Sequence, residues 1–141
     1  MANILVIDDE ELIRRYIRSL LEDSGHRLVF ARNGQEAGRF ARSHRFDVII
    51  VDMIMPEKEG IETILDFRRA MPEAKIIAIS GGGRTQNLDF LQIARQVGAT
   101  EVLRKPFVQK QMLDAVGRCL GLGPAAVPAQ RAASTRALEV S

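Results

Sequence analysis

Cysteine and long apolar runs are both scarce in this chain. Cys119 is the one thiol among 141 residues, which excludes an intramolecular disulfide and a cysteine-based metal site and predicts plain packing in an apolar helical stretch. The apolar runs reach four residues, as at 48–51, which is far shorter than the roughly 20 residues of a membrane span. Residues 1–7 lack the charged start of a signal peptide. We therefore expect a cytoplasmic protein without membrane segments.

Basic residues are not concentrated in any part of the chain. The 20 basic and 18 acidic residues are scattered and give a formal net charge of +2. No long basic run of the kind that follows a phosphate backbone is present, so direct nucleic-acid binding is not expected. The composition, 46% hydrophobic and 27% charged, is that of an ordinary globular domain.

Short apolar runs alternate with helical stripes of apolar residues along most of the chain. The run at 48–51 has no polar alternation, which is typical of a central parallel strand covered on both faces. Five strand–helix pairs are too few for a closed barrel, so the pattern favours an α/β fold with an open, doubly wound parallel sheet. Strands are expected at 4–7, 28–31, 48–51, 75–79 and 102–103, and the later helices at 85–97 and 108–120. Of the three earlier helices, the first has Tyr16 in its apolar stripe and Arg14 on a solvated charged face, the second begins at a cap formed by Asn33, and the third follows Gly60.

The sequence predicts one domain over residues 2–121 and a tail over residues 122–141. The tail is rich in alanine, contains Pro124 and Pro128 and shows no apolar period to bury, so we expect it to be flexible. It is compatible with a natural extension, with the start of a linker to an absent output domain, or with residues left by cloning.

Polar side chains follow four of the five expected strands. In an open parallel sheet, ligands bind beyond the carboxyl ends of the strands. If the first and third strands are neighbours, their carboxylates crowd into one cleft, where repulsion is costly unless a cation or a lysine compensates. The residues are Asp8 and Asp9 after the first strand, Asp52 after the third, Ser80 after the fourth and Lys105 after the fifth.

Oxygen ligands of this kind suit Mg²⁺, which takes one or two carboxylates, waters and phosphate oxygens. Zinc lacks its preferred ligands here, because His26 and His44 fall away from the strand ends. The sequence therefore predicts a magnesium site at the carboxyl edge of the sheet.

These strand-end residues together resemble the receiver domain of response regulators over about residues 2–121. Each motif is common by chance, but five in order on the right strand ends are specific. The resemblance implies a flavodoxin-like sheet of order 2-1-3-4-5 and a cis bond before Pro106. The motifs are Asp8-Asp9, Asp52, Met55-Pro56 with Gly60, Ser80, and Lys105-Pro106-Phe107.

The resemblance also implies a role for each acidic residue. Asp52 would be the nucleophile that forms an aspartyl phosphate with a phosphohistidine donor. Asp9 would coordinate Mg²⁺ most directly and Asp8 mainly through metal-bound water, alongside Asp52 itself. The backbone carbonyl of Ile54 would complete the protein's share of the coordination sphere.

Lys105 and Ser80 would respond to the phosphoryl group. Lys105 would pair with the carboxylate before transfer and with a phosphoryl oxygen afterwards. Ser80 would move to hydrogen-bond the phosphoryl group and pass this movement to the face made by residues 85–97, 102–103 and 108–120. The family has an aromatic switch residue where this chain has Val102, so a different relay is needed.

The sequence predicts that the protein is a phosphoacceptor receiver in a two-component phosphorelay. We expect it to be a stand-alone regulator and not an enzyme with a separate substrate. A histidine kinase or histidine phosphotransfer protein would donate the phosphoryl group, and a downstream target protein would dock on the signalling face. Two alternatives within the family are an N-terminal receiver fragment of a larger regulator and a phosphorylation-independent interaction module. The enzyme alternative is a haloacid-dehalogenase-like phosphohydrolase. Its pattern requires a second carboxylate two residues after Asp52, where this chain has Ile54.

Overall fold

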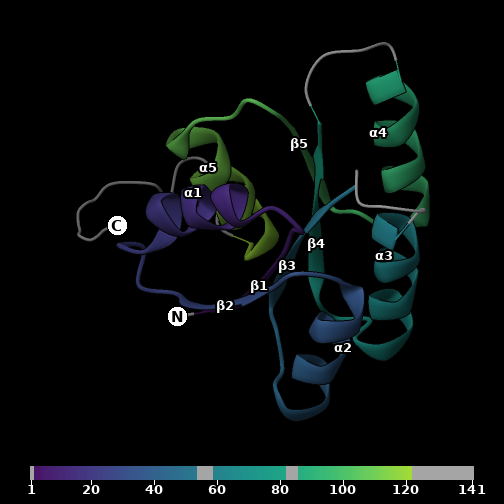
Figure 1. Cartoon of the computed structure of the whole chain (residues 1–141), viewed down its shortest axis with the longest axis horizontal. Coiled ribbons are helices and arrows are strands. Elements are labelled where there is room, and N and C mark those ends of the chain that lie inside the picture. Colours follow the sequence, from purple (N-terminus) through teal and green to yellow (C-terminus); the bar gives the residue numbers. More distant parts are fainter. Residues whose placement is uncertain (1, 54–58, 82–85, 122–141) are drawn as a thin grey trace.

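The computed structural model describes residues 2–53, 59–81 and 86–121, which form one parallel sheet with helices on both sides (Figure 1). Every strand and helix expected from the sequence is present, with ends displaced by one or two residues. The strands are β1 (Asn3–Ile7), β2 (Arg27–Ala31), β3 (Val48–Asp52), β4 (Lys75–Ser80) and β5 (Glu101–Arg104). The helices are α1 (Glu11–Leu21), α2 (Gly34–Ser43), α3 (Glu59–Ala70), α4 (Gln86–Val97) and α5 (Gln109–Cys119).

The strand order is β2-β1-β3-β4-β5 and every neighbouring pair is parallel. This confirms the predicted doubly wound, flavodoxin-like sheet. The order reverses direction between β1 and β3, which are hydrogen-bonded neighbours with Ile7 opposite Val51. Ligands of such sheets bind at this switch point, beyond the carboxyl ends of the strands.

Two hydrophobic clusters hold the layers together, one on each face of the sheet. Alternate residues of each strand point to opposite faces, so Ile4 joins the cluster under α1 and α5, whereas Leu5 joins the cluster under α2, α3 and α4 (Figure 1). All five residues of β3 are buried, as its uninterrupted apolar run predicted. Burying each large aliphatic side chain contributes about 1.5–3 kcal/mol, so the double layer accounts for most of the favourable packing.

The turn into α2 shows how local sequence sets an element boundary. The Asn33 side chain accepts a hydrogen bond from the Glu36 backbone N–H at 2.8 Å, which satisfies one of the free amides of the first helical turn. The Glu36 carboxylate in return accepts the Arg32 backbone N–H at 2.8 Å. The helix start that Asn33 predicts is therefore confirmed.

Cys119 lies buried in the cluster under α1 and α5, which confirms its predicted packing role. Burial raises the pKa of its thiol to about 12, so it stays protonated.

Among the described residues no helix is both long enough and apolar enough to cross a membrane. The predicted tail, residues 122–141, lies outside the described ranges, and its flexibility stays a prediction.

Candidate functional site

Three carboxylates meet at the carboxyl ends of β1 and β3. One carboxylate oxygen from each of Asp8, Asp9 and Asp52 lies within 4.8 Å of the others. Asp8 and Asp52 are buried, at 1% and 2% exposure, whereas Asp9 is exposed to solvent. The adjacency of β1 and β3 creates this cluster, because each strand delivers its terminal carboxylate to the same edge.

Lys105 supplies a positive charge to the two buried carboxylates. Its Nζ lies 3.4 Å from Asp52 Oδ2 and 3.9 Å from Asp8 Oδ2. The Lys105 backbone N–H donates to the carbonyl of Ser80 at 2.9 Å, which ties the end of β5 to the end of β4. The bond between Lys105 and Pro106 is cis, as the resemblance implied.

Ser80 is fully buried at the end of β4, and β4 is the direct neighbour of β3. Its hydroxyl donates to the carbonyl of Gly81 at 3.2 Å. The structure therefore brings Asp8, Asp9, Asp52 and Lys105 into one cluster, with Ser80 ending the adjacent strand.

Asp8 carries the clearest electrostatic perturbation in the cluster. Burial, and to a smaller extent the neighbouring Asp52, raise the pKa of its carboxyl from 3.8 to about 7. The Glu10 backbone N–H, which donates to Asp8 Oδ1 at 2.9 Å, and the Lys105 ammonium act in the opposite direction. Burial thus outweighs both stabilising contacts.

The sequence comparison decides the family. The family model described as "Response regulator receiver domain" matches residues 4–117. This chain is a response regulator receiver domain. It is 35% identical over 81% of its length to a response regulator receiver protein of an Anaeromyxobacter species and covers 47% of that protein. It is 31% identical over 83% of its length to the chemotaxis protein CheY of Bacillus subtilis and covers 96% of it.

A solved structure of a response regulator protein from Burkholderia pseudomallei matches the receiver with a TM-score of 0.72 and 29% identity. The match covers 82% of this chain and 66% of that one, which is described with a phosphorylated aspartic acid, calcium ion and citrate. The chain spans about half the length of some curated relatives and nearly the whole of others. Receiver domains are two-component signalling modules that interact with histidine kinases and downstream effectors and bind Mg²⁺ at an acidic pocket.

The acidic cluster of this receiver fits a magnesium ion. Asp8 Oδ2 is buried and has no hydrogen-bond partner, and a buried polar atom left without a partner is costly. The candidate ligands are all oxygens, the type that Mg²⁺ prefers. Ile54, whose carbonyl was the remaining expected ligand, lies outside the described residues, so that assignment stays a prediction. His26 hydrogen-bonds the backbone of Ala2 near the amino end of β1, far from this edge of the sheet.

Val102 occupies the position where the family pattern places an aromatic residue. It is partly buried on β5 beside Ala78 of β4 and packs against the cluster under α2, α3 and α4. A branched aliphatic side chain with few rotamers cannot swing between exposed and buried positions as an aromatic ring does. This receiver therefore has no aromatic side chain at this position that could act as a switch.

Two supporting contacts were not predicted from the sequence. Arg14, which the helical spacing assigned to a solvated charged face, donates to the backbone carbonyl of Asp8 at 2.7 Å. Tyr16, assigned to the apolar stripe, donates its hydroxyl to the carbonyl of Phe107 at 2.5 Å, and the two rings lie 5.7 Å apart. Both contacts connect α1 to the loops that carry the site. The first spans six residues and the second 91, and helical spacing alone reveals neither.

Gly60 of α3 lies directly against the backbone of Asp52 and Met53. A Cβ at this position would lie 2.7 Å from the carbonyl oxygen of Asp52 and 2.8 Å from Cα of Met53. Because backbone atoms cannot move away cheaply, we expect Gly60→Ala to lower the free energy of unfolding by about 1–3 kcal/mol. Urea denaturation of the receiver measures the change.

Gly38→Ala is the matched control for this prediction. A Cβ at Gly38 of α2 meets no atom within 4 Å, so alanine there is expected to be neutral or to stabilise by up to about 1 kcal/mol through its higher helix propensity. Equal effects of the two substitutions would contradict the close contact at Gly60.

Proposed function

We propose that this receiver accepts a phosphoryl group on Asp52 in a Mg²⁺-dependent reaction, and that phosphorylation switches a protein-interaction face. The observation that carries the proposal is the buried Asp52 carboxylate beside Asp8 and Asp9, with Lys105 Nζ at 3.4 Å. Such a set of charges is costly to bury without a cation or an electrostatic task.

In the proposed reaction, an Asp52 carboxylate oxygen attacks the phosphorus of a phosphohistidine in a histidine kinase or histidine phosphotransfer protein. An acyl phosphate bond forms, the bond to the donor imidazole breaks, and the imidazole nitrogen takes the electron pair. Lys105 provides a fixed positive charge beside the acceptor and stabilises charge on the phosphoryl oxygens. The phosphorylated aspartic acid of the Burkholderia relative supports this chemistry.

Asp8, Asp9 and Asp52 would hold the magnesium ion, with the Ile54 carbonyl as a further ligand. When bound, the ion offsets negative charge on the carboxylates and on the incoming phosphoryl group. The buried, unpartnered Asp8 Oδ2 supports this assignment, as does the calcium ion of the Burkholderia relative.

The proposed switch starts at Ser80, whose hydroxyl would leave the Gly81 carbonyl and bond the phosphoryl group. The end of β4 is linked to β5 by the hydrogen bond from Lys105 to the Ser80 carbonyl. A shift at Ser80 therefore reaches the face formed by α4, β5 and α5, where a downstream target protein would dock. Val102 makes a backbone or loop movement the proposed relay.

The length of the relatives supports two contexts for this function. A stand-alone regulator is supported by CheY, of which the chain covers 96%. A receiver within a longer regulator is supported by the Anaeromyxobacter protein, of which it covers 47%. We propose the stand-alone form, located in the cytoplasm as predicted from the sequence. A phosphorylation-independent interaction module is the second candidate, favoured by Val102 alone.

Incubation with acetyl phosphate and Mg²⁺, followed by intact-mass measurement, tests the proposal. We expect the native chain to gain one phosphoryl group and Asp52→Asn to gain none, because the amide cannot act as the nucleophile. Omission of Mg²⁺ should also abolish the gain. Asp23→Asn, at an exposed position away from the acidic cluster, is the matched control and should be labelled like the native chain. Labelling of Asp52→Asn, or no labelling of the native chain, would leave the interaction module as the better reading.

A further inference from the structure

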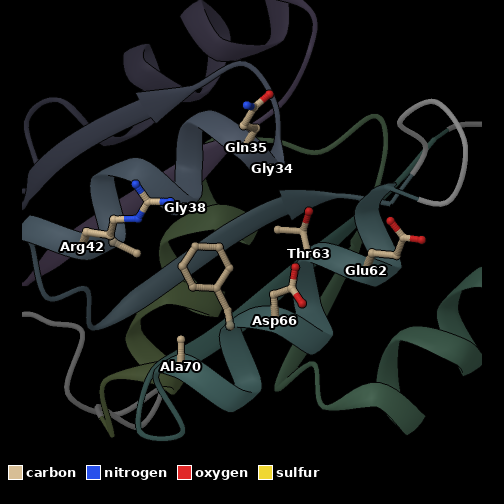
Figure 2. Close-up of a pocket in the computed structure, with 10 residues that line it drawn as sticks. Gly34, Gln35, Gly38, Arg42, Glu62, Thr63, Asp66 and Ala70 are labelled. Atoms are coloured by element: carbon tan, nitrogen blue, oxygen red, sulfur yellow. The ribbon is translucent and has the colours of Figure 1, made fainter.

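A cavity of about 370 Å³ lies between α2 and α3, and the described residues that line it include none of Asp8, Asp9, Asp52, Ser80 and Lys105 (Figure 2). This volume falls within the range of about 300–1,000 Å³ that small-molecule sites occupy. Its inner wall is apolar, with Phe67 at 3% exposure and contributions from Ala41 and Ala70. The cavity is therefore separate from the proposed phosphoryl-transfer site.

Two glycines leave part of the α2 wall without side chains. Gly34 and Gly38 are one turn apart and both line the cavity. Glycine inside a helix is less stable than alanine and is normally explained by the close approach of another group. At Gly38 no such group exists, because an added Cβ would meet nothing within 4 Å. The glycine leaves space between the helices and does not tighten their packing.

Thr63 of α3 offers a buried polar group to this space. The residue is 4% exposed, lines the cavity and has no side-chain hydrogen bond to any residue that the structure describes. Figure 2 shows its side chain directed across the gap toward Gly34 of α2. Its Oγ1 is not among the enclosed polar atoms that lack a partner, so it is accessible from the cavity, where a ligand atom can replace water as its partner.

Charged side chains of opposite sign stand at opposite ends of the cavity. Arg42 of α2 lies at one end, and Glu62 of α3 lies at the other, with Asp66 between them on the Glu62 side (Figure 2). Within the described parts of the chain none of these three side chains forms an ion pair. All three are exposed, so they remain available to a ligand.

We infer that the α2–α3 cavity binds a small zwitterion with an apolar body, of the amino-acid class. An ammonium group would face Glu62 and Asp66, an anionic group would face Arg42, and the apolar body would cover Phe67. Thr63 would hydrogen-bond the ligand near the ammonium end. Because no acidic-site residue takes part, this inference is independent of phosphorylation on Asp52.

Amide chemical-shift titration of the full chain with L-phenylalanine tests the inference. We expect saturable shifts confined to residues 34–42 and 62–70. Two analogues each lack one charge: phenethylamine has no carboxylate, and 3-phenylpropanoate has no amine. Each should bind up to about fivefold more weakly than L-phenylalanine, as expected for the loss of one solvent-exposed charge pair. Glycine lacks the apolar body and should give no saturable shift. Equal affinity for L-phenylalanine and 3-phenylpropanoate would overturn the zwitterion assignment.

Substitutions separate the contributions of cavity volume and charge. Gly38→Leu fills the cavity without a backbone clash and should weaken L-phenylalanine binding by about tenfold or more, while Gly38→Ala, with a smaller side chain, should weaken it less. Arg42→Gln should weaken binding of 3-phenylpropanoate but not of phenethylamine, and Asp66→Asn should do the reverse. Two results would overturn the site. One is L-phenylalanine binding that is unaffected by Gly38→Leu in a variant that melts like the native chain. The other is the absence of a saturable shift with any aromatic probe, which is expected if the cavity takes only a side chain of a protein partner.

Discussion

Asp8→Asn is expected to raise the free energy of unfolding at pH 8 by as much as about 4 kcal/mol in metal-free buffer. The folded-state pKa of Asp8 is about 7, against 3.8 for the ordinary group, because the carboxyl is buried beside Asp52. Between these values the native protein holds a proton that the unfolded chain releases, so stability falls as pH rises from about 4 to about 7. Above pH 7 the destabilisation is complete, and asparagine removes it.

Urea denaturation of both proteins across this pH range measures the effect. The difference in the free energy of unfolding between the Asp8→Asn variant and the native chain should be largest at pH 8. It should shrink toward zero as the pH falls to about 4 and below, where the Asp8 carboxyl becomes protonated in both the folded and the unfolded state. The lost attraction between Asp8 and Lys105 at 3.9 Å opposes the gain, so 4 kcal/mol is an upper bound. Asp23→Asn, at an exposed position, is the control. A variant that is less stable than the native chain at pH 8 would contradict a net cost of burying the ionised Asp8 carboxylate.

Lys105→Met is expected to slow phosphorylation of Asp52 by about 100–1,000-fold, the usual cost of removing one preorganised electrostatic contact at a reacting centre. Lys105 Nζ lies 3.4 Å from the acceptor carboxylate, and methionine keeps a side chain of similar length without the charge. The rate of mass gain with acetyl phosphate and Mg²⁺ measures the change, and circular dichroism checks that the variant is folded.

Lys110→Met is the matched control for Lys105→Met. Lys110 is an exposed lysine on α5 that pairs with Asp114 at 2.9 Å, and such surface pairs contribute only about 0–1 kcal/mol. Its loss should leave the phosphorylation rate unchanged. If both lysine variants reacted at the native rate, Lys105 would be a structural partner of the carboxylates and would have no part in the transfer.

Local sequence patterns were sufficient for the elements and for the membership of the site. The apolar run of β3 predicted a strand buried on both faces, and Asn33 predicted the start of α2 through a contact that spans three residues. Asp52 and Lys105 were identified because they follow apolar runs, and parallel strands place their carboxyl ends at one edge. These predictions depend only on residues close together in the chain and on the general rule that parallel strands end at the same edge of a sheet.

The tertiary structure decided everything that depends on contacts between residues far apart in sequence. Asp8 and Asp9 are adjacent in the chain and have the same chemistry, yet Asp8 is buried and Asp9 is exposed. Tyr16 fitted an apolar stripe, but the pairing of its hydroxyl with Phe107 links residues 91 positions apart. The space between α2 and α3 likewise depends on how two helices pack. The sequence determined the family, the strand order and the acidic site, because these follow from periodicity and motif order; packing alone decided which charges are buried and where a cavity remains.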